Sequence, residues 1–168
     1  MKIEIKKLTM TALLIALCVV GANIKFLGSI ALDSFPAFVG TLLLGPLPGA
    51  LLGFLGHMVS ALLAGFPSTL PVHLIIGVFM AICMLVYGYL HKLFFSRKLL
   101  SSVLASVGAY LINVPLALLC LYPILGKAVF ALFVPLTVST VINLFLAEVV
   151  VLAIPVKYKE RIISNERG

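Results

Sequence analysis

Long apolar segments without a single Asp, Glu, Lys or Arg residue constrain the fold of this chain more than any other feature. Such segments occupy residues 8–24, 71–91 and 99–121. The whole chain is 63% hydrophobic and 10% charged, whereas an average soluble domain is about a quarter charged. About 20 apolar residues suffice to cross a bilayer as a helix. We therefore predict an all-α integral membrane protein with a single transmembrane domain over residues 1–168.

Glycine, proline and charged residues divide the apolar sequence into six predicted transmembrane helices. The G-P-L-P-G segment at residues 45–49 predicts a sharp reversal. Pro115 predicts a kink beside Asn113. The last apolar run starts at Ala128 and is longer than one span needs, so its first residues, as far as the region of Pro135, are assigned to the preceding loop. The predicted helices span residues 8–24, 36–44, 49–64, 71–91, 99–121 and 133–155.

The distribution of basic residues predicts the orientation. Ten of the twelve Lys and Arg residues lie in the N-terminal lead, the 91–98 loop and the C-terminal tail. With six helices these segments share one side of the membrane, and the positive-inside rule makes that side the cytoplasm, so both termini are expected there. The net charge of +7 is therefore read as an orientation signal and an attraction to anionic membrane lipid, and no nucleic-acid partner is expected.

The chain lacks the motifs of several functional classes. Cys18, Cys83 and Cys120 lie in three different apolar runs without a C-x-x-C pair, so neither a disulfide framework nor a metal site is expected, and no cofactor is predicted. An intramembrane enzyme remains an alternative, although H-E-x-x-H and G-x-S-x-G are absent. A secondary transporter is also open, although neither internal halves nor an acidic residue at mid-depth is found.

Polar side chains in the outer half of the predicted bundle indicate a binding pocket. Such groups are costly in a bilayer and usually face a cavity or the bundle interior. The third helix carries a face of small residues, which allows close helix approach and leaves room for a ligand ring beside its histidine. Two phenylalanines lie in the loops above. The predicted ligand-binding residues are Asp33, Phe35, His57, Ser60, Phe66, His73, Asn113 and Asn143.

Several of these residues have a structural alternative. A buried His57 would then bond to a neighbouring helix, and Asn113 would satisfy the carbonyl that the nearby proline leaves free. Asp33 and His73 lie at predicted helix starts and would serve as caps. Glu148 is interpreted as a partner contact or a structural pair rather than as a ligand group.

Four segments of the chain resemble a known family. They are the A-x-x-x-A of Ala12 and Ala16 behind a basic lead, L-D-S-F-P at 32–36, L-G-P-L-P-G-A-L-L-G at 44–53, and G-H-M-V-S-A-L-L-A-G-F-P at 56–67 with P-V-H after it. Together with six helices they resemble the substrate-binding S component of an energy-coupling factor (ECF) transporter. The second and fourth segments are most similar to the S component for α-ribazole, the nucleoside precursor of the cobalamin lower ligand. Cobalamin, thiazoles and pyrimidines stay open.

The resemblance implies a transport subunit in the bacterial cell membrane and not an enzyme. Such components bind a vitamin or its precursor from outside, under loops that close over it. They then topple on a transmembrane coupling subunit, driven by two cytoplasmic ATPase subunits. Ala12 and Ala16 match the motif that contacts the coupling subunit. The chain has no G-x-x-x-x-G-K-[ST], so ATP hydrolysis is expected from the partners.

The orientation is testable by labelling. In a variant whose native cysteines are replaced, Ser96→Cys should react with a membrane-impermeant maleimide after the cells are permeabilised, because the 91–98 loop is expected in the cytoplasm. Strong labelling in intact cells would rule the arrangement out.

Overall fold

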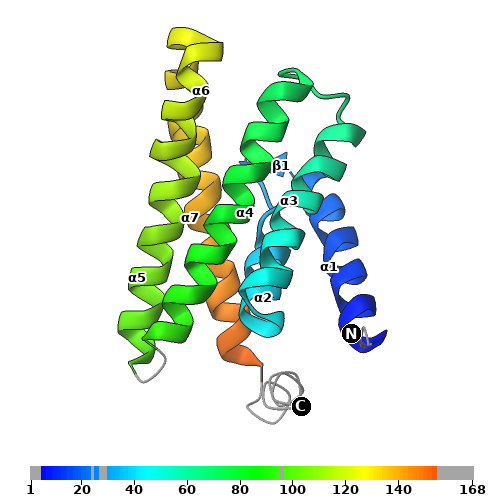
Figure 1. Ribbon diagram of the computed structural model, residues 1–168, viewed down its shortest axis with the longest axis vertical. Helices are drawn as coiled ribbons and strands as arrows, with labels where there is room; N and C mark the ends of the chain where they lie inside the picture. The colour runs from blue at the N-terminus through cyan, green and yellow to red at the C-terminus, as the bar shows by residue number, and fades with distance from the viewer. Residues whose placement is uncertain (1–4, 24, 27–29, 95–96, 155–168) are drawn as a thin grey trace.

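The computed structural model describes residues 5–23, 25–26, 30–94 and 97–154, which are mostly helical (Figure 1). A two-stranded antiparallel pairing joins Lys25 to Ala31 and Phe26 to Ile30. In chain order the elements are α1 (Ile5–Asn23), β1 (Lys25–Phe26), β2 (Ile30–Ala31), α2 (Phe35–Leu44), α3 (Pro46–Leu63), α4 (Leu70–Leu93), α5 (Lys98–Leu111), the π-helical turn η1 (Ile112–Leu116), α6 (Ala117–Leu125), the 3-10 turn η2 (Gly126–Ala128) and α7 (Val129–Ala153).

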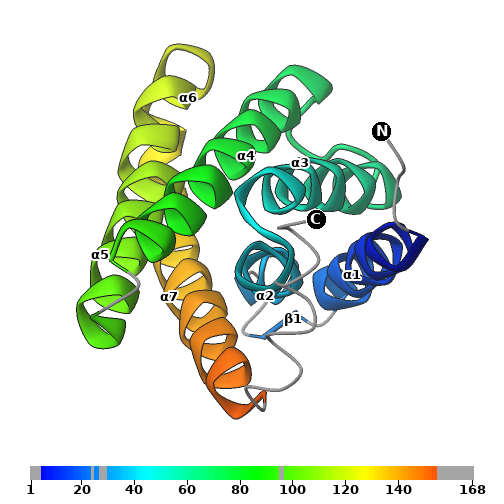
Figure 2. The same cartoon turned by 60° about the horizontal axis from the view of Figure 1, so that its bottom comes forward.

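The short helix α2 lies at the centre of the bundle, between α1, α3 and α7 (Figure 2). Residues 36–41 of α2 are all buried, as are Leu43 and Leu44. A helix that is apolar on every side is stable only when other elements surround it. With 10 residues α2 is about 15 Å long, roughly half the thickness of the hydrocarbon core. The helix therefore starts inside the bundle and runs toward one end of it.

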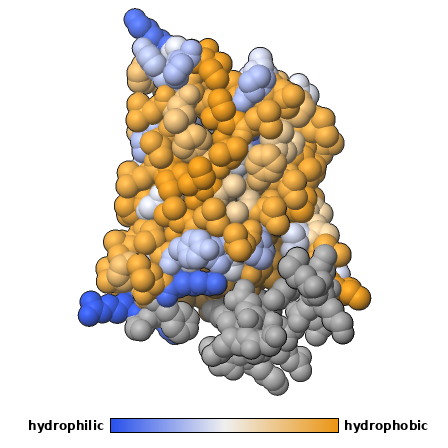
Figure 3. All heavy atoms as spheres, viewed as in Figure 1, coloured by the Kyte–Doolittle hydropathy of each residue, from blue (hydrophilic) through white to orange (hydrophobic). Residues whose placement is uncertain are grey.

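Three helical stretches are long and apolar enough to cross a membrane: α3, α4 and the continuous stretch Lys98–Ala153. Residues 8–23 of α1 and the whole of α2 form shorter apolar helices. Lys98–Ala153 counts as one stretch because its helical elements follow one another directly in the sequence, but Gly126 (φ 56°, ψ −141°) turns the chain, and α7 runs back alongside α6 and α5 (Figure 1). The predicted count of six spans is therefore not confirmed. Apolar residues cover most of the face in Figure 3, as expected for a membrane protein.

The start of α1, the end of α4, the start of α5 and the end of α7 lie at the same end of the bundle, at the bottom of Figure 1. Most of the basic lead and tail lies outside the described residues, which begin at Ile5 and end at Ile154. The cytoplasmic location of the termini stays a prediction.

Glycines in α3 let three neighbouring helices approach closely. A Cβ atom on Gly49 would collide with Thr41 of α2, one on Gly53 would meet α4, and one on Gly56 would meet Cys18 of α1. The predicted close helix approach at this small face is confirmed. Neighbouring helices fill the space beside these three glycines, and the expected room for a ligand ring beside His57 stays a prediction.

The prolines differ from the sequence-based prediction at two of three places. Pro46 and Pro48 lie in the first turn of α3, where a missing N–H has no helical partner to lose, and the reversal falls on Gly45 at φ 98°. The distortion predicted at Pro115 is the π-helical turn η1. The assignment of residues before Pro135 to a loop is wrong, since α7 starts at Val129 and contains this proline. A membrane helix tolerates such a proline when its surroundings satisfy the freed carbonyl.

Gly49→Ala should destabilise the protein because the added methyl group meets Thr41 in a packed interface. Overpacking of this kind costs about 1–3 kcal/mol. Thermal unfolding in detergent can be followed with a dye that fluoresces on reaction with thiols, since Cys18 and Cys83 are buried and react only on unfolding. The exposed Cys120 is first replaced by serine to lower the background.

Leu51→Ala on the same helix is the matched control, because Leu51 is 58% exposed. This variant should unfold near the wild-type temperature. A Gly49→Ala protein as stable as the control would contradict the packing described above.

Candidate ligand-binding site

Two histidines from adjacent helices form a direct contact. His57 of α3 and His73 of α4 approach with 3.2 Å between His57 Nε2 and His73 Nδ1, and either nitrogen can be the donor, depending on the tautomers. Their ring centroids are 5.3 Å apart. The ring of Phe66, in the connection between α3 and α4, lies 5.7 Å from that of His73. The structure thus brings three of the predicted site residues together.

Two buried polar atoms at this pair have no hydrogen-bond partner among the residues that the structure describes. They are Nε2 of His73 and Oγ of Ser60, which lies on α3 one turn after His57. A buried donor or acceptor left without a partner costs about 1–3 kcal/mol. Native structures contain few such groups, and each calls for an explanation. A polar ligand that reaches both atoms would remove this cost.

The connection that holds Phe66 has an unusual backbone. Phe66 has φ 50° and Thr69 has φ 76°, whereas Gly65, also with positive φ, adopts such a conformation without strain. Side chains other than glycine pay about 1–2 kcal/mol in this region. The Phe66 N–H donates to the carbonyl of Ala61 at 2.9 Å, which holds the turn in place. Strained residues of this kind cluster at active sites and ligand clamps.

Asp33 lies just before α2 and close to α1. The N–H of Leu32 donates to the carbonyl of Gly21 at 3.1 Å, and a Cβ atom on Gly21 would collide with the Leu32 carbonyl. The Asp33 carboxylate accepts a hydrogen bond from Ser34 Oγ at 3.2 Å. Ser34 and Thr69, the N-cap residues of α2 and α4, make no side-chain capping bond. Asp33 therefore lies between α1 and the start of α2, and its part in ligand binding stays a prediction.

The two predicted asparagines lie in a separate polar cluster inside the bundle. Asn143 Oδ1 accepts from the backbone N–H of Phe35 at 2.7 Å, and Asn143 Nδ2 donates to the carbonyl of Ser139 at 2.8 Å. Asn113 donates to Thr140 Oγ1 at 2.8 Å rather than to a carbonyl freed by proline. Both asparagines are buried, and Phe35 packs against the main core. In the structure these three residues hold helices together, and their contact with a ligand stays a prediction.

A third polar cluster surrounds Glu148 of α7, and sequence reasoning did not identify the partners of this residue. Its Oε1 accepts from the Tyr87 hydroxyl at 2.7 Å and pairs with His91 Nε2 at 2.8 Å, and its Oε2 accepts from Ser102 at 2.9 Å. Ser101 Oγ lies 3.0 Å from His91 Nδ1. The network joins α4, α5 and α7, which agrees with the interpretation of Glu148 as a structural pair. An acidic residue in an apolar run was the available signal, because such a residue requires partners.

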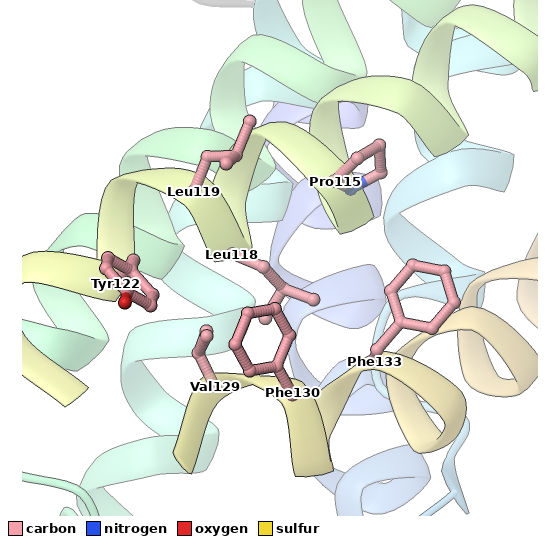
Figure 4. Close-up of a pocket in the computed structure, with 7 residues that line it drawn as sticks. All are labelled: Pro115, Leu118, Leu119, Tyr122, Val129, Phe130 and Phe133. Atoms are coloured by element: carbon pink, nitrogen blue, oxygen red, sulfur yellow. The ribbon is translucent and has the colours of Figure 1, made fainter. Parts of the chain in front are cut away.

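An apolar groove lies away from all of these residues, between α6 and α7 (Figure 4). Its volume is about 450 Å³, and the Tyr122 side chain supplies the one polar side-chain group in its lining. A site that orients a small molecule needs several placed polar groups. The groove therefore does not replace the histidine pair as the candidate site. It is lined by Pro115, Leu118, Leu119, Tyr122, Val129, Phe130 and Phe133.

Within the described part of the chain, no group of three or more His, Cys, Asp and Glu residues is arranged to hold a metal ion. Comparison with known proteins gives one match. The family model described as "ECF transporter, substrate-specific component" matches residues 6–155. No curated protein and no solved structure matches the chain.

Proposed function

We propose that this chain, which belongs to the family of ECF transporter substrate-specific components, binds α-ribazole outside the cell and delivers it for uptake. The family consists of transport subunits and not enzymes, and together with the apolar helices it indicates a multi-pass membrane protein. Membership also implies a small-molecule substrate and an ECF module with a transmembrane coupling subunit and ATPase subunits.

The observation that supports a binding site at the histidine pair is the presence of two buried polar atoms, on Ser60 and His73, that have no partner in the described part of the chain. The strained turn beside them holds an aromatic ring, Phe66, next to His73. A flat heteroaromatic nucleoside needs apolar walls and a few placed polar groups. Phe66 supplies a wall, the histidines and Ser60 supply donors and acceptors, and Asp33 can accept from two sugar hydroxyls.

The proposed transport cycle follows from the family. The ligand enters from the outer face of a bacterial cell membrane, and the loaded subunit topples on the coupling subunit. Two cytoplasmic ATPases drive this step, because the chain contains no phosphate-binding loop of its own. Ala12 and Ala16, both exposed and one turn apart on α1, form the proposed contact with the coupling subunit.

Asp33→Ala and His57→Ala should each weaken α-ribazole binding about ten- to a hundredfold. A hydrogen bond to a charged group contributes about 1.5–3 kcal/mol, and every 1.4 kcal/mol is a factor of about ten in the dissociation constant. Isothermal titration calorimetry on the purified proteins measures the change. Glu148→Gln, in a network that joins other helices, should bind nearly as wild type.

The thiol-reactive unfolding assay shows whether the weakened variants remain folded. Unchanged affinity in both the Asp33 and His57 variants would place the site elsewhere. If the wild type bound no α-ribazole, the ligand assignment would be wrong. Mass spectrometry of small molecules that co-purify with the protein would then identify the ligand.

Ala12→Leu and Ala16→Leu should abolish uptake while the isolated protein still binds α-ribazole, because larger side chains prevent close helix contact with the coupling subunit. Uptake of labelled α-ribazole is measured in cells that also produce the ECF module. Leu17→Phe is the control, since Leu17 is 51% exposed and lies about 100–140° around α1 from Ala16 and Ala12. Equal loss of binding and uptake in both alanine variants would show that these residues serve packing and not docking.

A further inference from the structure

We infer that His73 Nε2 donates a hydrogen bond to the unprotonated ring nitrogen of an azole ligand, and that His57 sets the tautomer of His73 that makes this possible. The inference rests on the proposed function, because α-ribazole is a nucleoside of a benzimidazole. It assigns the recognition of the base to one named atom, and it makes His57 a positioning residue for the base.

The chemistry of the histidine pair links the two rings. A neutral imidazole has one N–H donor and one acceptor nitrogen. When His57 Nε2 donates across the 3.2 Å contact, His73 Nδ1 accepts, so the proton of His73 must lie on Nε2. When the contact is reversed, Nε2 of His73 becomes an acceptor. The tautomer of one ring therefore fixes what the other presents.

The ligand selects between these two states. A benzimidazole that carries a sugar on one ring nitrogen keeps a second ring nitrogen that has a lone pair and no hydrogen. Such a nitrogen can accept a hydrogen bond and cannot donate one. It therefore favours the state in which His73 Nε2 carries the proton and His57 donates to His73.

The surroundings of His73 fit this role better than a purely structural one. The large majority of buried polar side-chain atoms in native proteins have a hydrogen-bond partner in the protein or in ordered water. His73 has its Nδ1 on His57, whereas its buried Nε2 has no partner among the described residues. The Phe66 ring, tilted by 57° to that of His73, leaves an aromatic surface next to it. Aromatic rings pack well at centroid separations of about 4.5–7 Å.

A cycle that changes both the ligand and the protein tests the contact. The two ligands are α-ribazole and its indole analogue, in which a C–H group replaces the free ring nitrogen. Wild-type protein should bind the analogue at least about tenfold more weakly, the effect of one lost hydrogen bond to a buried group. His73→Phe should bind the two ligands equally, because the donor is gone. His73→Leu provides the same test if the first variant does not fold.

Three further variants separate the roles of the neighbouring residues. Ser60→Ala should keep the wild-type ratio between the two ligands even if both bind more weakly. His57→Leu should lower this ratio, because nothing then donates to His73 Nδ1 to favour the tautomer with the proton on Nε2, and His57→Gln should retain it, since a glutamine side chain can still donate to His73 Nδ1. Calorimetry gives the dissociation constants, and the thiol-reactive assay shows that each variant is folded.

The outcomes distinguish this inference from the proposed function. If His73→Phe and His73→Leu discriminate between the ligands as the wild type does, His73 does not read the ring nitrogen, although α-ribazole remains the ligand. If His57→Leu keeps the ratio, the positioning role of His57 is wrong. If the wild type binds no α-ribazole, both the ligand assignment and this inference fall.

Discussion

The start of α2 inside the bundle is the constraint on which the rest of the structure depends. The first N–H groups of a helix have no partner within it, and in a bilayer water is not there to replace one. Here the side chain of Asn143 of α7 accepts from the N–H of Phe35. The next residue, Pro36, has no N–H. The N–H of Phe38 donates to the backbone carbonyl of Ser34. These arrangements let a helix of half the usual length begin within the protein. They also place Asp33 two residues before its first residue.

The packing of α3 follows from that arrangement and fixes the position of His57. Glycines 49, 53 and 56 of α3 face α2, α4 and α1 in turn, so α3 is held on three sides by rigid neighbours. His57 follows the last of these glycines, and Ser60 lies one turn further along. Glycine in a helix is intrinsically unfavourable by about 1 kcal/mol relative to alanine. Close packing offsets this cost and leaves the histidine little freedom to move away from α4.

Sequence patterns predicted the features that depend on local spacing. Helical periodicity identified the small face of α3, and Pro115 indicated the distortion that became a π-helical turn. The polar contacts across the bundle were beyond such reasoning. Asn143 and Phe35 are separated by 108 residues, and Glu148 and His91 by 57. Periodicity gives the face of a helix, but it gives neither the depth of a residue relative to a distant helix nor its partner there. The asparagines were therefore placed with the ligand site, although their side chains bond within the bundle.

The difference between the two clusters that contain histidine separates a structural network from a candidate binding site. Both lie between membrane helices, where an unsatisfied polar group is costly. Around Glu148, the carboxylate bonds to Tyr87, His91 and Ser102, and His91 also contacts Ser101. The protein itself therefore supplies the hydrogen-bond partners of this cluster. At the other pair, His57 and His73 satisfy each other on one side, and His73 Nε2 and Ser60 Oγ remain buried without a partner among the described residues. A chain that satisfies one cluster completely and leaves the other incomplete, beside a strained aromatic turn, points to the second as the place where a polar ligand contributes the missing bonds.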